Sequence, residues 1–350
     1  MKDDPARNPP EIIESENALD ELMTRPRTEL IEFVRTLSNP LLVLGAGGKM
    51  GPSLAVLARR AAEAAQHKLE VIAVSRFSDK QSREWLEARG VRTVSCDLIE
   101  REALRQLPDS GNIINMVGFK FGTSVNPALT WAMNTLVPAH IAERFSTSRI
   151  AVLSSGNVYP LLEPRSGGAV ETDSLTPVGE YANACVARER VFEFFSQKNG
   201  TAIVCLRLNY AVDLRYGVLL DIAEKVHAGR PVELITGYFN CIWQGDANEF
   251  IIRSLGLASA PSTSLNLTGP AVLSVREVAL QFGKSFGRPV QFVGAEAETA
   301  LLNNPKRLCS ILGNPPTPLE TVVHWTAHWV TTGGRLLNKP THFEVRDGRY

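Results

Sequence analysis

A short apolar run, Leu41–Leu44, passes directly into a glycine-rich turn and then into a helix-forming stretch. Gly45, Gly48 and Gly51 recur at three-residue spacing in this turn. A strand, such a turn and a helix N-terminus form an anion site, because the backbone N–H groups point outward and the helix dipole favours negative charge. Glycine lets the backbone approach a diphosphate that a side chain would block. The stretch therefore predicts a dinucleotide-binding unit, and an ordinary tight turn is the alternative.

Apolar runs alternate with helix-forming segments through the first part of the chain. The runs lie at 41–44, 71–74, 91–94, 113–117, 150–153 and 202–206, and the helical segments at 53–65, 81–89, 100–107, 127–144 and 179–197. This alternation predicts an α/β fold with a Rossmann-type, doubly wound parallel sheet. The runs are apolar throughout, as expected for strands that are covered on both faces. Ligands of such sheets bind at the carboxyl ends of the strands.

We expect four parts along the chain. Residues 1–37 form a helical leader, 38–206 the dinucleotide-binding Rossmann domain, 207–335 mainly a smaller α+β substrate-binding lobe, and 336–350 a polar tail that could form an extended arm. The sequence leaves open whether the leader packs on the first domain or on a partner subunit.

Composition excludes several classes of partner. The 350 residues carry a formal net charge of zero, which argues against nucleic-acid binding and against binding to an anionic membrane. We find no apolar run long enough to span a bilayer and no apolar signal region at the N-terminus. The five cysteines form no Cys-x-x-Cys pair, which favours a reducing compartment. We therefore expect a cytoplasmic protein that acts on a small molecule.

Two positions bear on the choice of nicotinamide cofactor. An acidic residue at the end of the second strand would bind the ribose 2′-hydroxyl of NAD, whereas an arginine accommodates the 2′-phosphate of NADP. Arg76 occupies this region, and Lys49 adds a second positive charge near the phosphates. This favours NADP, with NAD possible, unless Arg76 simply faces water. Asp97, before Leu98, could accept from the adenine amino group or cap the next helix, and both alternatives stay open.

These motifs resemble the extended short-chain dehydrogenases/reductases of the NAD-dependent epimerase/dehydratase family. The glycine spacing is that family's form, with Met50 where the Gly-x-Gly-x-x-Gly pattern has its last glycine. Further matching positions are the adenine-pocket pair Asp97 and Leu98, the turn with Met116, Val117 and Gly118, and Asn134 of the following helix. The resemblance covers roughly residues 40–332, and implies that these residues serve the cofactor and the active site.

The same resemblance implies a damaged catalytic site. Ser154–Pro160 resembles the Ser-Ser-x-x-Val-Tyr-Gly motif, in which Ser155 would polarise a substrate oxygen. Tyr181 matches the tyrosine of Tyr-x-x-x-Lys, which exchanges a proton with the substrate, but Cys185 stands at the lysine position. A lysine cation would lower the pKa of the tyrosine, and a cysteine cannot supply that charge.

Three interpretations follow. In the first, the protein is an active oxidoreductase or epimerase in which another cation, Arg188 or Lys120, replaces the lysine. Alternatively, Tyr181 and Ser155 only hydrogen-bond the substrate oxygen. In the third interpretation the protein binds NADP(H) without turnover, as a catalytically inactive sensor or scaffold.

Substrate signals are weaker. The candidate substrate-binding residues are Lys120, Asn157 and Asn209. The family's nucleotide-sugar pattern is incomplete after Arg207, so we expect an unactivated sugar, polyol or sugar acid. We expect no metal, because the helical stretch with His324 and His328 has Trp325 where a metalloprotease has its glutamate. A homodimer through 127–144 and the Tyr181 helix is possible, as in family relatives.

Overall fold

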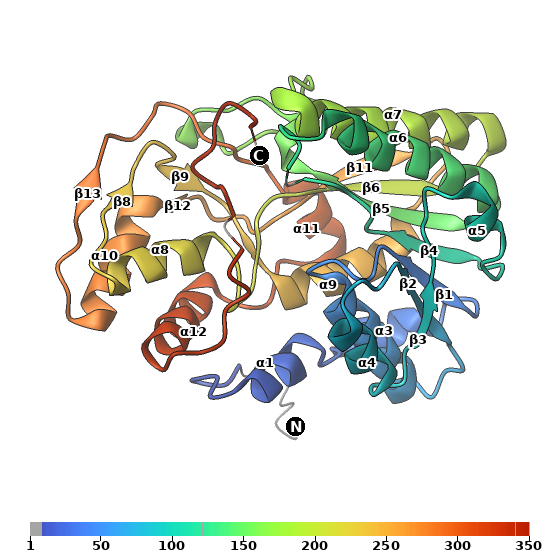
Figure 1. The fold of residues 1–350 in the computed structure, drawn as a ribbon, viewed down its shortest axis with the longest axis horizontal. Helices are drawn as coiled ribbons and strands as arrows, with labels where there is room; N and C mark the ends of the chain where they lie inside the picture. Colours follow the sequence, from blue (N-terminus) through green and yellow to red (C-terminus); the bar gives the residue numbers. More distant parts are fainter. Residues whose placement is uncertain (1–8, 121, 340, 350) are drawn as a thin grey trace.

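The computed structural model describes residues 9–120, 122–339 and 341–349, and a parallel sheet is its central layer (Figure 1). The described strands of this sheet follow the order β11-β6-β5-β4-β1-β2-β3, and all neighbouring pairs are parallel. Their bounds are β1 Leu41–Leu44, β2 Val71–Ser75, β3 Arg92–Ser95, β4 Asn112–Asn115, β5 Arg149–Ser155, β6 Ile203–Leu208 and β11 Thr263–Leu267. The order reverses between β1 and β4, where open α/β sheets bind their ligands. This confirms the predicted Rossmann-type fold.

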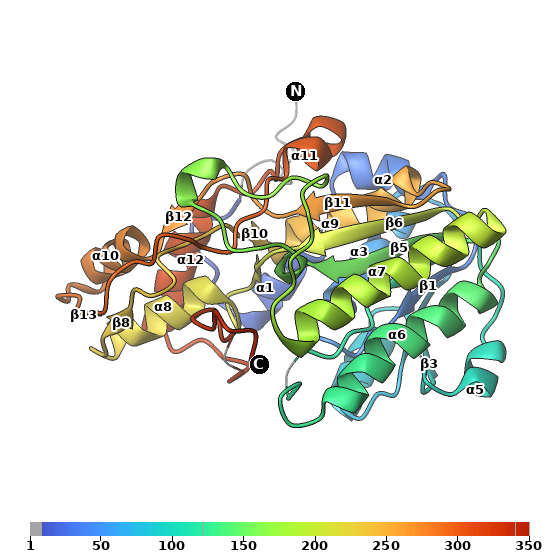
Figure 2. The same ribbon diagram turned by 90° about the horizontal axis from the view of Figure 1, so that it is seen from above.

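Helices cover both faces of the sheet. Figure 2 shows α6 and α7 running together along one face, with α3 and α9 on the other. In β1, Leu41 and Val43 enter the core beneath α3, whereas Leu42 and Leu44 enter the core beneath α6. Because alternate side chains point to opposite faces, the strand must be apolar throughout. The helices here are α2 Thr28–Val34, α3 Gly51–Ala64, α4 Lys80–Glu87, α5 Arg101–Arg105, α6 Pro127–Arg144, α7 Gly179–Asn199 and α9 Gln244–Arg253.

A second core lies beside the sheet and forms the smaller lobe. Its elements are α1 Glu16–Met23, α8 Val218–His227, α10 Val275–Phe286 and α12 Leu319–Thr331, with α11 Lys306–Leu312 nearer the sheet. The short strands are β7 Ala211–Val212, β8 Val232–Glu233, β9 Tyr238–Phe239, β10 Ile242–Trp243, β12 Leu273–Ser274 and β13 Phe292–Val293. Trp325 and Trp329 of α12 are buried in this core.

The spatial division does not follow the predicted boundary at residue 206. Strand β11 pairs with β6 and extends the main sheet, with Leu265 opposite Leu206. Helix α9 packs on α3 beneath the same sheet. Both elements come from 207–335, so the chain returns from the lobe to complete the first domain. The sequence pattern missed this because pairing between distant strands leaves no local signal.

The leader packs on its own chain, which resolves the question that the sequence left open. Leu30 of α2 joins the core beneath the sheet, whereas Leu19 of α1 joins the core of the lobe. Between them, the Arg27 guanidinium forms an ion pair with the buried Asp246 of α9. The leader therefore connects the two cores. Residues 1–8 lie outside the described part.

The predicted polar arm at the C-terminus is instead a packed segment, which we call the C-terminal strap (residues 341–349). Figure 1 shows the end of the chain running between the two parts of the molecule. Phe343 is only 2% exposed and belongs to the core of the lobe. Glu344 pairs with Lys225 at 2.6 Å, and Arg346 donates to the Thr299 carbonyl at 2.6 Å. The expectation of an arm missed these partners, which lie far away in the sequence.

A buried ion pair fixes α7 to the sheet. Glu189 of α7 and Arg207 of β6 approach to 2.7 Å, and both side chains are almost fully buried. The Ser154 hydroxyl at the end of β5 donates to Glu189 at 2.6 Å, and Arg207 donates to the Tyr159 hydroxyl at 2.6 Å. This network joins α7 to two strands, and so determines where its other side chains lie.

We expect Glu189→Gln to lower the free energy of unfolding by about 3 kcal/mol or more, because it leaves the Arg207 cation buried without its counterion. Glu193→Gln, one turn further along α7, is the control, since Glu193 pairs with Arg190 at the surface and such pairs contribute at most about 1 kcal/mol. Urea unfolding of the two variants measures the difference. Equal losses would contradict the assigned role of the Glu189–Arg207 pair.

Candidate functional site

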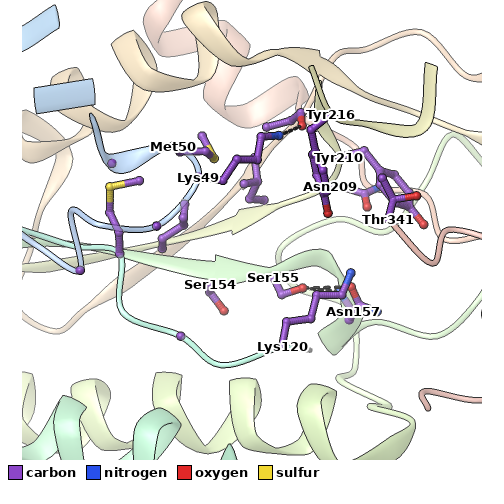
Figure 3. A pocket seen from close by; sticks show the side chains of 18 of the residues that line it. Lys49, Met50, Lys120, Ser154, Ser155, Asn157, Asn209, Tyr210, Tyr216 and Thr341 are labelled. Atoms are coloured by element: carbon purple, nitrogen blue, oxygen red, sulfur yellow. Dashed lines mark hydrogen bonds between the residues drawn. The ribbon is translucent and has the colours of Figure 1, made fainter. Parts of the chain in front are cut away.

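A pocket of about 390 Å³ opens at the carboxyl ends of β1, β4, β5 and β6, where the strand order reverses (Figure 3). The glycine turn forms one wall, and the turn after β4 and the N-terminal part of α7 form others. Residues of the lobe and the segment before the strap complete it. The position is the one that the fold predicts for a ligand.

The glycine turn is shaped by close backbone approach. A Cβ on Gly45, whose φ is +80°, would lie 2.9 Å from the Val117 nitrogen, and one on Gly51 would lie 2.4 Å from the Ala46 carbonyl oxygen. Gly48 differs, because its Cβ would meet only the Gly45 oxygen, at 3.4 Å, and Gly48 lines the pocket. The first two glycines are therefore required by the fold, whereas Gly48 keeps space open beside the pocket.

The N-terminus of α3 meets this pocket. Met50 and Gly51 line it, and no side chain caps the helix start. The first N–H groups of a helix have no partner within the helix and favour an anion. The turn and this helix start thus fit the diphosphate of a dinucleotide.

Lys49 lines the pocket together with the glycine turn, and its side chain extends toward the lobe. Its ammonium donates to the Ala211 carbonyl at 2.8 Å and lies 4.2 Å from the centre of the Tyr216 ring, toward which Figure 3 shows it extending. Burial lowers the pKa of Lys49 to about 8. The side chain points across the pocket to the lobe, because a carbonyl and an aromatic ring accept its charge there.

The residues expected at the adenosine end lie outside this pocket, at the ends of β2 and β3. The Arg76 guanidinium lies 3.9 Å from the Asp97 carboxylate, and Arg76 is largely exposed. Asp97 accepts from the Ile99 N–H at 3.3 Å, whereas Glu100 is the N-cap residue of α5. Leu98 is buried in the core. Asp97 therefore supports a local turn, and the structure leaves its carboxylate at the surface.

In the turn after β4, Gly118 lies against a buried arginine side chain. Met116, Val117 and Gly118 all line the pocket. A Cβ on Gly118 would lie 2.8 Å from the Arg188 guanidinium, which lies directly beneath the turn. The Met116 N–H donates to the Leu44 carbonyl at 2.9 Å and continues the pairing of β4 with β1.

The structure brings Ser155 and Tyr181 together on the pocket wall. The Tyr181 hydroxyl is hydrogen-bonded to Ser155 and to the Cys185 thiol. Ser155 also donates to the Asn157 amide oxygen at 3.0 Å. Ser155, Asn157 and Tyr181 all line the pocket, so the residues predicted to meet a substrate oxygen share one surface.

Cys185 lies one turn after Tyr181 on α7 and is fully buried. Burial raises the pKa of its thiol, so the group is neutral near pH 7. Burial is also the largest influence on Tyr181 and raises the pKa of its phenol far above the usual range. The Arg188 charge and the Ser155 hydrogen bond oppose this shift but do not overcome it. Tyr181 is therefore a protonated hydrogen-bond donor.

Both cations that the sequence suggested as replacements line the pocket. Arg188 is 2% exposed and donates to the Leu153 carbonyl at 2.6 Å and to the Asn134 side chain, while its Nε has no hydrogen-bond partner. The Lys120 ammonium lies 5.9 Å from the centre of the Tyr181 ring, and burial lowers its pKa to about 8. Positive charge therefore lies near Tyr181, although not at the predicted helix position.

Asn134 and Asn209 lie at different distances from the pocket, and both side chains are held by hydrogen bonds within the protein. Asn134 is fully buried and lies off the pocket, where it holds Arg188 and donates to the Phe119 carbonyl at 3.2 Å. Asn209 does line the pocket, but its amide donates to Asn240 at 2.8 Å within a buried network. We expect Asn134 to act only through Arg188.

Sequence reasoning missed the pocket residues supplied by the lobe and the chain end. These are Tyr210, Tyr216, Gly217, Val218, Lys339 and Thr341. Tyr210 has a φ of +43°, a conformation with no reliable sequence signal. The others reach the pocket only through the packing of the lobe and the strap.

Within residues 9–120, 122–339 and 341–349, no helix is long and apolar enough to cross a membrane. The same ranges contain no group of three or more His, Cys, Asp or Glu side chains arranged to hold a metal ion.

Known structures share this architecture. UDP-glucose 4-epimerase from Thermotoga maritima, solved with UDP-glucose, superposes with a TM-score of 0.68 at 15% identity, over 84% of this chain and 99% of that one. The dTDP-glucose 4,6-dehydratase of Streptomyces venezuelae, solved with NAD, gives 0.71 at 16% identity, over 84% and 97%. UDP-glucose 4-epimerase from Thermus thermophilus, in complex with NAD, gives 0.67 at 19%, over 83% and 98%. At these identities, the likeness shows the fold.

The sequence itself supplies the family. A comparison with curated proteins finds no match. The model of the NAD dependent epimerase/dehydratase family, a family of nicotinamide-dependent enzymes, matches residues 41–239, from the first strand of the sheet into the lobe. With this match, over more than half of its length, the chain belongs to the NAD dependent epimerase/dehydratase family.

Proposed function

We propose that this protein is an NAD(P)-dependent oxidoreductase or epimerase that acts on a hydroxyl or carbonyl of a sugar, polyol or sugar acid. The observation that carries the proposal is the hydrogen-bonded pair of Ser155 and Tyr181 on the wall of the pocket that the glycine turn also lines. A diphosphate site and an acid–base pair in one pocket are what hydride transfer at a C–O bond requires.

The cofactor would be held by residues of the turns that follow β1 and β4, on the two sides of the point where the strand order reverses. The diphosphate would lie against Gly48 and the start of α3, near Lys49, and the turn Met116–Gly118 would border the remainder. When bound, the nicotinamide ring supplies the carbon that accepts or donates hydride. The protein contributes binding, orientation and proton handling.

Ser155 and Tyr181 would contact the reacting oxygen of the substrate. Because Tyr181 is protonated, it can donate its proton to a carbonyl oxygen that becomes a hydroxyl. The opposite direction needs a phenolate, which nearby positive charge favours. Arg188 and Lys120 would supply this charge in place of the missing lysine, but burial outweighs it and keeps Tyr181 protonated. Proton donation to a carbonyl, and hence reduction, is therefore the step that this site supports near neutral pH.

The second candidate function is binding without turnover, as a sensor or scaffold. A neutral, fully buried Cys185 at the lysine position favours it, since the usual means of lowering the pKa of the tyrosine is lost. The two functions share cofactor binding and differ in whether Tyr181 participates in a reaction.

The proposal also includes a preference for NADP and a homodimer. Arg76 at the end of β2 favours NADP over NAD.

A homodimer through α6 and α7 is supported by Leu136 and Phe194, which are 51% and 56% exposed on these helices. A cytoplasmic location remains a prediction from the sequence.

Gly48→Ala tests cofactor binding without disturbing the fold. Its Cβ would make only an ordinary contact within the protein but would occupy space needed by a diphosphate. We expect NADP⁺, NADPH, NAD⁺ or NADH to raise the melting temperature of the wild type, and the shift to be largely lost in the variant. The ligand-free melting temperatures should agree. Absence of any shift in the wild type would refute dinucleotide binding.

Arg76→Ala tests the choice of cofactor. A charge-assisted hydrogen bond to the 2′-phosphate contributes about 1.5–3 kcal/mol, so we expect the Kd for NADPH to rise about tenfold or more. The Kd for NADH should not change. Arg83→Ala on α4 is the exposed control. A wild type that prefers NADH in calorimetry would overturn the NADP assignment.

Tyr181→Phe distinguishes the enzyme from the sensor. Loss of a general acid should lower kcat for carbonyl reduction by about a hundredfold or more, while NADPH still binds. Since the pKa of Tyr181 is raised above its usual value, the phenol stays protonated throughout the neutral range. The wild-type reduction rate should therefore show no loss attributable to Tyr181 between pH 6 and pH 9. Undiminished turnover in the variant would remove Tyr181 from the mechanism.

A further inference from the structure

The described charged residues that line the pocket are all positive. Among its described lining residues, Lys49, Lys120, Arg188 and Lys339 carry positive charge, and none is an aspartate or glutamate. The chain as a whole has a net charge of zero, so this excess is local. A wall with charges of one sign concentrates ligands of the opposite sign.

The cofactor accounts for only part of this charge. Lys49 belongs to the glycine turn and would lie at the diphosphate end. Arg188 contacts neutral oxygens, those of Leu153 and Asn134, so its buried charge has no carboxylate beside it in the described chain. Lys120 lies at the Tyr181 end, where Figure 3 shows it near Ser155 and Asn157. This end of the pocket therefore carries positive charge that the diphosphate would not neutralise.

The strap limits the size of what can bind there. Thr341 lines the pocket and is fixed to the Asp221 carboxylate, to which its N–H donates at 3.2 Å. Beyond Asn157 and Tyr210, the strap residues Phe343 and Arg346 leave a cavity of about 40 Å³. A cavity of that size accommodates little more than water, whereas sites for drug-sized ligands span about 300–1,000 Å³.

We propose that the substrate is a small hydroxylated anion, a sugar-sized molecule that carries a carboxylate or a phosphate. Lys120 and Lys339 bind the anionic group, and the reacting hydroxyl or carbonyl lies at Ser155 and Tyr181. The strap excludes substrates linked to a nucleotide. This inference rests on the proposed oxidoreductase function and specifies its substrate class.

The test measures binding to the NADPH-loaded full-length protein by calorimetry, which does not require turnover. The probes are a hexuronate, a hexose 6-phosphate, the neutral hexose and a UDP-hexose. We expect one anionic sugar to bind at least tenfold more tightly than the neutral hexose, and the carboxylate and phosphate probes identify which anion is preferred. UDP-hexose should bind at least tenfold more weakly than the preferred anion.

Lysine variants test which side chains bind the anionic group of the sugar. Lys120→Gln and Lys339→Gln should each raise the Kd of the anionic sugar about tenfold and change that of the neutral hexose much less. Lys284→Gln, an exposed lysine on α10 outside the pocket, should change neither. Equal binding of neutral and anionic sugars, or tightest binding of UDP-hexose, would overturn the inference while NADPH binding stands. Failure to bind NADPH would instead defeat the proposed function and the inference with it.

Discussion

The close approach of two backbone segments at the strand reversal determines the rest of the site. A side chain at Gly45 would collide with the Val117 backbone, and one at Gly51 with Ala46, so β1, the turn after β4 and the start of α3 can meet only through glycine. This contact aims the uncapped N-terminus of α3 into the pocket. The buried Glu189–Arg207 pair then holds α7 against β5 and β6, so that Tyr181 faces the same space.

Burial and charge have opposing effects at the pocket wall that carries Tyr181. Burial raises the pKa of Tyr181, and the charge of Arg188 acts in the opposite direction but is the smaller effect. In a site with Tyr-x-x-x-Lys, a lysine on the same helix would add a second cation. Here Cys185 is neutral, and Lys120 approaches Tyr181 from the turn after β4 instead. Positive charge therefore lies near the tyrosine on other elements, but burial outweighs it and keeps the phenol protonated.

Local patterns were sufficient for much of this structure. The glycine spacing and the alternation of strands and helices predicted the sheet, and 127–144 is the span of α6. Ser155 and Tyr181 were predicted from motifs that resemble those of the family, and both line the pocket. What the sequence did not predict depends on long-range packing: β11 joining the sheet, the Lys49 side chain extending toward Tyr216, and the chain end packing into the lobe. No spacing in the sequence encodes these contacts.

We propose that one pocket holds both the dinucleotide and the Ser155–Tyr181 pair. A crystal structure of the protein with bound NADPH measures this directly. The account predicts the diphosphate against Gly48 and the start of α3, with the nicotinamide ring bordered by Tyr181. A dinucleotide bound elsewhere, or with its nicotinamide directed away from Tyr181, would contradict it.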